Sequence, residues 1–259
     1  MQPLIIDSHC HAGKGDGLAG PWNTNASLKD YVQWCKRSGI ERTVLFAALT
    51  SDYTRANAEV ARIVRRHPDR FYGYAFVNAA TDKGHIFDMV RTAVEEYHFC
   101  GIKIHRHDAP ISREVCETAR RFHLPVLYDV MGEIATVELL ATEYPDINFI
   151  IPHLGTFSDN WSQQLAFIDH LVRHPNIYTD SSGVKRFDLF KMAFERAGAH
   201  KILYGTDGPW LHPGVELSKI FYLDASPEQQ QAILSGNFLR LTSRARARHS
   251  FLPHSQPFL

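Results

Sequence analysis

The chain has 259 residues, of which 44% are hydrophobic and 22% are charged. This composition is typical of globular proteins, and the length is enough to bury a large core. Lysine plus arginine and aspartate plus glutamate are equal at 28 each, so the chain lacks the overall basic charge that would attract nucleic acid or an anionic membrane. These observations argue against a polyanionic partner and favour a small-molecule substrate.

Cysteine usage and the N-terminal sequence indicate a cellular compartment. The four cysteines are far apart and include no Cys-x-x-Cys pair, which favours reduced thiols. The first residues lack a basic segment followed by a long apolar one, and no run reaches the ~18 apolar residues of a membrane span. We therefore expect a cytoplasmic enzyme without a membrane segment.

Short apolar runs typical of β-strands recur from one end of the chain to the other. Segments with apolar residues at helical spacing lie between them, and a further helical segment follows Ser226. The expected helices include the ranges 28–35, 60–64, 86–94 and 165–172. The eight expected strands cover 4–11, 42–49, 71–78, 101–105, 125–130, 147–153, 176–182 and 201–207.

The alternation of strands and helices predicts parallel strands joined by right-handed crossovers. Eight such units in about 250 residues predict an α/β fold of the (β/α)₈ TIM-barrel type. We expect one domain, residues 1–242, with a C-terminal helical extension on the barrel and a tail at 243–259. A doubly wound open sheet is the alternative, but no Gly-x-Gly-x-x-Gly turn follows the first strand.

Two histidines one residue apart close the first apolar run, which reads LIIDSHCH from Leu4 to His11. Side chains at positions i and i+2 of a strand leave the same face about 7 Å apart, so His9 and His11 can converge on one ion. The alternative is a strand end whose two histidines are hydrogen-bonded or solvated. Cys10 lies between them and should point toward the helices, so we expect no cysteine nucleophile.

Other strand-like runs also end in polar residues, and catalytic groups of a barrel come from these strand ends. Several histidines and carboxylates directed into one barrel mouth would be costly without an ion or a substrate. Two imidazoles with one or two carboxylates suit a divalent ion of the zinc type. The strand-end residues are His9, His11, Lys103, His105, Asp129, His153 and Asp207, of which His9, His11, Asp129 and Asp207 are the candidate metal ligands.

Cationic side chains cluster at the end of the strand expected at 101–105. Lys103 can pair with Asp129 or bind a substrate carboxylate. His105 and His107 flank Arg106, and this trio suits a carboxylate or a phosphate. The alternative for the trio is a solvated loop.

The loops near the end of the chain offer further candidates. Trp210 and His212 follow Asp207 and could form a wall of a substrate pocket, although Trp210 could equally cap the barrel core. Asp180 and Ser181 end the strand expected at 176–182, and we expect them to brace the barrel mouth.

Six sequence motifs span nearly the whole chain. They are DSHCH at 7–11, GIKIH at 101–105, LPVLYD at 124–129, IIPHLG at 150–155, YGTDGPW at 204–210 and ILSGNFLRL at 233–241. In these motifs and their order the chain resembles the amidohydrolase superfamily, and within it the amidohydrolase-related group that includes aromatic-acid decarboxylases and some lactonases.

The resemblance implies roles for four residues. His9 and His11 would be metal ligands, His153 would be a catalytic base or would polarise the substrate, and Asp207 would be a ligand that also transfers protons. Lysine at the position of Lys103 is carboxylated and bridges two metals in other branches of the superfamily. An inward lysine without that modification is the interpretation that we favour.

The chain departs from the family pattern at the fifth strand, which ends in Tyr128 and Asp129 where members usually carry a histidine ligand. An aspartate can bind zinc, manganese or iron through oxygen, but the site is then less rich in nitrogen. Some lactonases of the group are thought to work without metal, so chemistry without an ion stays an alternative.

The predicted activity is that of a metal-dependent hydrolase acting on an ester, lactone or amide bond of a small carboxylated or aromatic substrate. Water activated at the ion and deprotonated by Asp207 would attack a carbonyl held near His153. A non-oxidative decarboxylase of an aromatic or enoic acid is the alternative, and a catalytically silent binding protein is a third. Barrels commonly dimerise, so a homodimer is one expected assembly.

Overall fold

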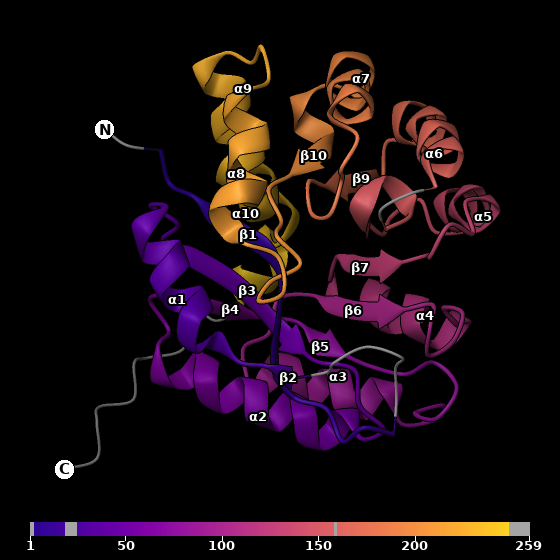
Figure 1. The fold of residues 1–259 in the computed structure, drawn as a ribbon. Helices are drawn as coiled ribbons and strands as arrows, with labels where there is room; N and C mark the ends of the chain where they lie inside the picture. The colour runs from indigo at the N-terminus through magenta and orange to yellow at the C-terminus, as the bar shows by residue number, and fades with distance from the viewer. Residues whose placement is uncertain (1–2, 19–24, 158–159, 249–259) are drawn as a thin grey trace.

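The computed structural model describes residues 3–18, 25–157 and 160–248 as an α/β structure in which helices surround the strands (Figure 1). The strands are β1 (Ile6–Lys14), β2 (Asn25–Ala26), β3 (Arg42–Ala47), β4 (Phe71–Gly73), β5 (Ala75–Phe76), β6 (Ile102–His105), β7 (Val126–Asp129), β8 (Phe149–Ile151), β9 (Ile177–Asp180) and β10 (Ile202–Leu203). The helices are α1 (Leu28–Arg37), α2 (Tyr53–Arg66), α3 (Ile86–Glu95), α4 (Arg113–Phe122), α5 (Ala135–Glu143), α6 (Trp161–Arg173), α7 (Phe187–Ala197), α8 (Pro213–Phe221), α9 (Pro227–Gln231), α10 (Asn237–Leu241) and α11 (Ser243–Ala247), with short helical turns η1 (Pro152–Gly155), η2 (Ala199–Lys201) and η3 (Ala232–Gly236).

The strands form two hydrogen-bonded sheets in the orders β2-β1-β3-β4 and β10-β9-β8-β7-β6-β5. Within the described residues, every strand pair except β1 with β2 is parallel. β4 and β5 follow each other closely, so residues 71–76 join the two sheets. At the opposite seam, the Ser8 N–H donates to Tyr204 O at 2.9 Å and the Asp207 N–H donates to His9 O at 2.8 Å. The predicted α/β fold with parallel strands inside a layer of helices is confirmed.

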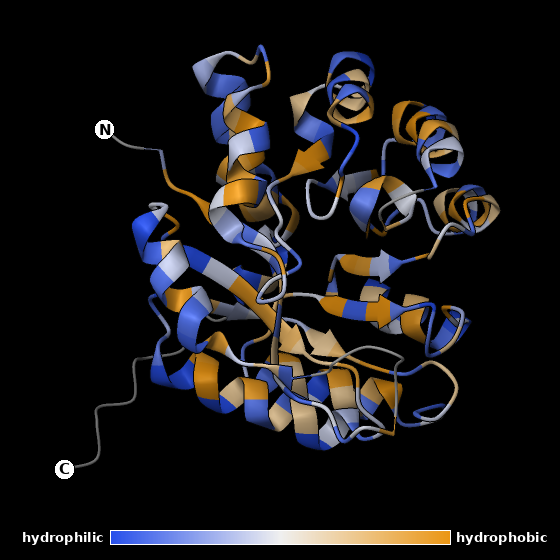
Figure 2. Ribbon diagram, in the orientation of Figure 1, coloured by the Kyte–Doolittle hydropathy of each residue, from blue (hydrophilic) through white to orange (hydrophobic). Residues whose placement is uncertain are grey.

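Local sequence explains why these elements form. Every residue of β6, β7, β8 and β9 is buried, as expected for parallel strands covered on both faces. Helices α1, α4 and α6 begin after Ser27, Ser112 and Asn160, whose side chains accept a backbone N–H of the first turn. Figure 2 shows that the strands are mainly hydrophobic, whereas the helices around them carry both hydrophobic and hydrophilic residues.

Most expected elements occur close to their predicted places. The helices expected at 28–35, 60–64, 86–94 and 165–172 correspond to α1, α2, α3 and α6. Each expected strand is present, although the one at 71–78 is divided into β4 and β5. Four further helices, α4, α5, α7 and α8, complete the alternation of strands and helices.

The expected C-terminal extension packs on the last strand in three consecutive pieces, α9, η3 and α10. The Asn237 side chain donates to Ala199 O at 2.8 Å and to Ile202 O at 2.7 Å, which ties α10 to β10. Helix α11 lies inside the stretch expected to be a tail, and its Ala245 is buried. The remainder of that stretch, 249–259, lies outside the described residues.

All four cysteines are buried free thiols, in keeping with the sequence analysis. Among the described residues, no helix has both the length and the apolar character needed to cross a membrane.

Asp7 is a fully buried carboxylate that holds β1 to the segment after β10. It accepts the backbone N–H groups of His9 and Thr206 at 3.0 Å each and the Thr206 hydroxyl at 2.6 Å. The Tyr31 hydroxyl of α1 also donates to it. Burial raises the pKa of Asp7 to about 7, although these hydrogen bonds favour the ionised carboxylate.

We expect Asp7→Ala to lower the free energy of unfolding by about 3–5 kcal/mol, because four donors would lose their buried acceptor. Asp7→Asn should cost less, since its amide oxygen can still accept the two backbone N–H groups. Denaturant unfolding measures both changes. The exposed Asp169→Ala is the control, and a loss of under about 1 kcal/mol for Asp7→Ala would contradict this role.

Candidate metal centre and active site

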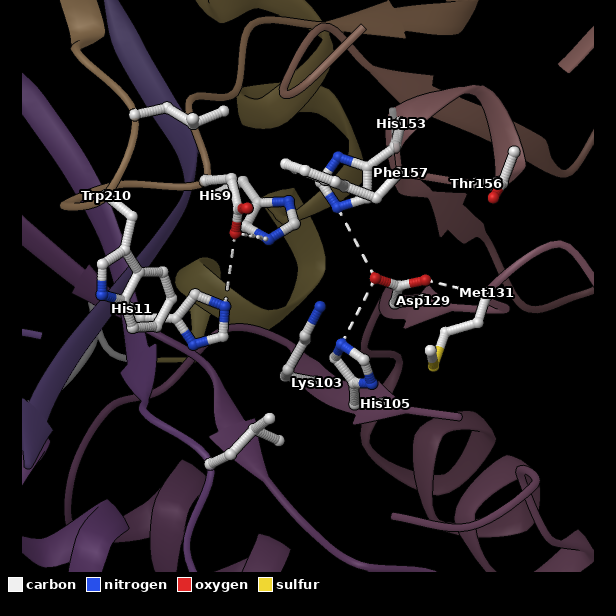
Figure 3. Close-up of a pocket in the computed structure, with 13 residues that line it drawn as sticks. His9, His11, Lys103, His105, Asp129, Met131, His153, Thr156, Phe157 and Trp210 are labelled. Carbon is white, nitrogen blue, oxygen red and sulfur yellow. Dashed lines mark hydrogen bonds and ion pairs between the residues drawn. The ribbon is translucent and has the colours of Figure 1, made fainter. Parts of the chain in front are cut away.

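The C-terminal ends of the strands surround a cavity with a volume of ≈ 420 Å³ (Figure 3). All the strand-end candidates for metal or substrate binding line it, together with Trp210, whereas Arg106, His107 and His212 do not. The lining residues are His9, His11, Leu49, Lys103, His105, Asp129, Met131, His153, Thr156, Phe157, Asp207, Trp210 and Leu211.

His9 and His11 leave the same face of β1, and the partners of their Nδ1 atoms fix both rings. His9 Nδ1 lies 2.8 Å from Asp180 Oδ2, and His11 Nδ1 lies 2.9 Å from Ala47 O. Both partners are acceptors, so each Nδ1 carries a proton and each Nε2 is the atom that can offer a lone pair to an ion. Burial opposes a charge on His9, but the Asp180 carboxylate outweighs burial and raises its pKa, which makes His9 a basic ligand.

Asp207 supplies an oxygen between these two nitrogens. Its Oδ1 lies 3.3 Å from His9 Nε2 and 3.5 Å from His11 Nε2, and the three ligand atoms lie within 4.8 Å of one another. Tetrahedral zinc with bonds of about 2.1 Å separates its ligand atoms by roughly 3.4 Å. The residues therefore fit a divalent ion with a further position left for substrate.

Asp129 belongs to a second, neighbouring cluster and is not one of these three ligands. Its Oδ2 lies 3.3 Å from His105 Nε2 and 3.6 Å from His153 Nε2, and its Oδ1 accepts the Met131 N–H at 2.9 Å. The His107 N–H donates to His105 Nδ1, so His105 carries its proton on Nε2 and directs it at Asp129. Burial lowers the pKa of His105 to about 3, so that ring is neutral.

His153 is the imidazole of the cavity whose pKa favours the protonated form. Its Nδ1 lies 2.7 Å from Ser182 O, and its ring contacts Phe157 edge to face. Burial disfavours its charge, but the carboxylates of Asp129, Asp207 and Asp180 outweigh burial and raise its pKa to about 9. His153 is therefore protonated at neutral pH, with its Nε2–H on the side of Asp129 and the cavity.

Lys103 lies between the two clusters and is completely buried. Its Nζ makes no hydrogen bond and lies 5.1 Å from the centre of the Phe46 ring. Burial lowers its pKa, while the carboxylates of Asp129, Asp207 and Asp180 oppose that shift. Burying an amine without an acceptor is costly, and an anion placed beside Lys103 would offset that cost.

The candidate residues predicted in loops differ in whether they line the cavity. Trp210 lines the cavity, and its ring lies 4.8 Å from that of His11. Arg106 instead pairs with Glu133 at 2.7 Å, and His212 caps α8 while its ring lies 4.9 Å from that of Trp34. The structure does not bring Arg106 and His212 together with the other candidate residues.

Two features of the site have no clear sequence signal. Asp180, which the sequence analysis assigned a bracing role, directly holds His9, and the Ser182 carbonyl directly holds His153. In addition, Met131, His153 and Asp207 have positive φ angles of 48°, 59° and 56°. Strained backbone of this kind often occurs where a side chain must be held for function.

An α/β barrel with converging imidazoles and carboxylates at its strand ends is a frame for metal-dependent chemistry on small molecules. The chain belongs to the amidohydrolase family, because the model of the family described as Amidohydrolase matches residues 6–241. No sequence among curated proteins matches the chain.

Solved structures share the fold at low sequence identity. A 5-carboxyvanillate decarboxylase, LigW from Sphingomonas paucimobilis, is 12% identical, with a TM-score of 0.73 over 93% of this chain and 99% of that chain. A dihydroxybenzoic acid decarboxylase from Polaromonas sp. JS666, solved with bound manganese and the inhibitor 2-nitroresorcinol, is 17% identical, with a TM-score of 0.74 over 97% and 100%. A 4-oxalomesaconate hydratase from Rhodopseudomonas palustris is 17% identical, with a TM-score of 0.72 over 95% and 98%.

We expect Asp180→Asn to weaken metal binding by about 10- to 100-fold while the fold is kept. The amide NH₂ can replace Oδ2, which would force His9 Nδ1 to accept and move the ring proton to Nε2, the atom that should bind the ion. Isothermal titration with Mn²⁺ and Zn²⁺ measures the change. Asp188→Asn, an exposed carboxylate paired with Arg186, is the control, and equal affinities for the two variants would refute the argument.

Proposed function

We propose that the protein is a metal-dependent, non-oxidative decarboxylase that releases CO₂ from a small aromatic acid. The observation that carries the proposal is the buried Lys103 Nζ, which has no hydrogen-bond partner and lies in the same cavity as the His9, His11 and Asp207 donor set. The similarity of the fold to decarboxylases of aromatic acids supports this reaction over the hydrolysis predicted from the sequence.

His9, His11 and Asp207 would hold the divalent ion, and zinc, manganese and iron stay candidates because two nitrogens with a carboxylate suit each of them. When bound, such an ion supplies positive charge that can orient a substrate carboxylate or a neighbouring hydroxyl.

The cavity walls suit an aromatic ring. Leu49, Met131, Phe157 and Leu211 provide apolar surface, and Trp210 adds an aromatic face on the side of His11. A cavity of this size with few converging polar groups is typical of small-molecule sites. The ring would lie among these side chains with its carboxylate near Lys103.

Decarboxylation needs a proton as well as a place for the carboxylate. The bond between the ring carbon and the carboxylate breaks, its electron pair stays on the carbon, and that carbon takes up a proton as CO₂ leaves. His153 is the candidate donor because its pKa is raised to about 9 and its Nε2 faces the cavity. The net reaction consumes one proton and leaves water unchanged.

Hydrolysis of an ester, lactone or amide is the second candidate. Asp207 favours it, since this carboxylate lies beside the two histidine nitrogens, which lower its pKa despite burial and so keep it ionised. A carboxylate in that place can accept a proton from water.

A panel of hydroxybenzoic acids, enoic acids, aryl esters and lactones in ¹⁸O-labelled water separates the two reactions. We expect CO₂ release from an aromatic acid with no ¹⁸O in the decarboxylated product. His9→Ala combined with His11→Ala should remove the metal bound in the cavity and abolish the CO₂ release. Full turnover by metal-free wild type, or labelled product from an ester or lactone alone, would overturn the proposal.

Lys103 and His153 should affect different kinetic parameters. We expect Lys103→Met to raise KM by about 10- to 100-fold, because a charged hydrogen bond contributes about 1.5–3 kcal/mol to binding. His153→Gln should instead lower kcat by about 10²- to 10⁴-fold, because it removes the proton donor. Steady-state kinetics on the active acid measures both, with the exposed Lys191→Met as control. An unchanged KM in Lys103→Met would rule out carboxylate binding by this residue.

A further inference from the structure

A second cluster of side chains that could hold a metal ion lies on the outer layer of helices, between α5 and α6, which lie side by side at the right of Figure 1. It consists of Glu138 from the first turn of α5 and of His170 and His174 from the end of α6. These residues do not line the barrel cavity, and the family resemblance and the proposed function assign them no role.

The spacing of the two histidines is suited to chelation. Residues four apart on a helix lie on the same face, and His-x-x-x-His is the arrangement by which helices present two imidazoles to one zinc ion. The rings of His170 and His174 are nearly parallel, at 13°, with centres 5.8 Å apart. Both rings also reach Glu138 on the neighbouring helix.

The distances match those between the ligands of one ion. Glu138 Oε2 lies 3.1 Å from His170 Nδ1 and 3.0 Å from His174 Nε2, and the three atoms lie within 4.8 Å of one another. Ligand atoms around tetrahedral zinc are separated by roughly 3.4 Å. Small side-chain movements would therefore bring all three atoms to bonding distance.

The hydrogen bonding of His170 is also consistent with a metal site. Its Nδ1 is buried and, although it is close to Glu138 Oε2, makes no hydrogen bond, so the nitrogen is not aligned with that oxygen. His174 Nε2, by contrast, is hydrogen-bonded to the same oxygen at 3.0 Å, so His170 Nδ1 is the buried nitrogen of the cluster that is left without a partner and that an ion could bind.

The backbone of the cluster is held in place independently of any ion. Lys201 Nζ donates to His174 O, and Asn176 Nδ2 donates to Ala141 O at 3.3 Å and to Tyr144 O at 3.0 Å. These bonds tie the end of α6 to the end of α5. A preformed pair of ligand-bearing helices lowers the entropic cost of closing a metal site.

We propose that Glu138, His170 and His174 form a structural binding site for a zinc-type divalent ion that links α5 to α6, with a fourth position open to solvent. Arg173 would compete with the ion for Glu138, because the Arg173 guanidinium donates to Glu138 Oε2 at 2.9 Å. The Arg173 side chain is 59% exposed and is therefore free to move away. The ion would displace Arg173 into solvent. No bond is made or broken other than coordination.

The test uses ZnCl₂ and the full chain in which His9→Ala and His11→Ala have removed the cavity ligands. We expect this protein to bind one zinc per chain, and the further changes His170→Gln and His174→Gln to weaken that binding by about 100-fold or more. Arg173→Gln should tighten it, because a competing cation is gone. Isothermal titration and elemental analysis give affinity and stoichiometry, and His67→Gln on the surface is the matched control.

The same site can be read out in the protein with an intact cavity. There, His170→Gln with His174→Gln should lower the zinc content by one equivalent and reduce the zinc-dependent rise in Tm to the part contributed by the cavity ion, with kcat and KM unchanged. No zinc bound to the cavity variant, or binding that is the same with and without His170 and His174, would overturn the proposal. Because this readout does not depend on the cavity, its failure is distinguishable from failure of the proposed decarboxylase activity.

Discussion

The geometry of the barrel mouth depends on one buried pair, His9 Nδ1 with Asp180 Oδ2 at 2.8 Å. The pair decides which nitrogen of His9 carries a proton and therefore where the free lone pair points. Asp180 Oδ1 also accepts the Ser182 N–H at 3.1 Å, and the Ser182 carbonyl in turn accepts from His153 Nδ1. One carboxylate at the end of β9 thus orients a ring from β1 and a ring that follows β8, although these strands are far apart in the sequence.

Asp129 explains why the polar residues separate into two clusters. The family resemblance places a histidine here, and an aspartate carboxylate ends nearer to its own backbone than a histidine nitrogen does. In this chain the carboxylate meets His105 at 3.3 Å and His153 at 3.6 Å, and its negative charge keeps His153 protonated. The carboxylate at this position therefore helps to keep the His153 imidazole protonated, and the proposed protonation of a carbon would need such a group.

Site residues at the ends of strands could be predicted from the sequence, whereas those in loops could not. His9, His11 and Asp207 follow apolar runs, and a buried strand that stops at a polar residue places that residue at the barrel edge. Arg106 and His212 lie in loops, where the direction of a side chain depends on turns that the pattern does not encode. The fold could be predicted from the sequence because segments with the periodicity of strands alternate with segments with the periodicity of helices. The pairing of Asp180 with His9 could not, because it depends on the tertiary contact between β1 and β9.

On the proposed reaction, Lys103 would connect the electrostatics of the cavity to turnover. Burial lowers the pKa of its amine, and a carboxylate bound beside it would restore the charged form, so substrate binding and protonation of Lys103 reinforce each other. On the proposed reaction that carboxylate leaves as neutral CO₂, and the attraction that held the acid disappears with it. The remaining arene has no anionic group for Lys103 to bind. The residue that draws the acid into the cavity would then favour substrate over product, which promotes release after each reaction.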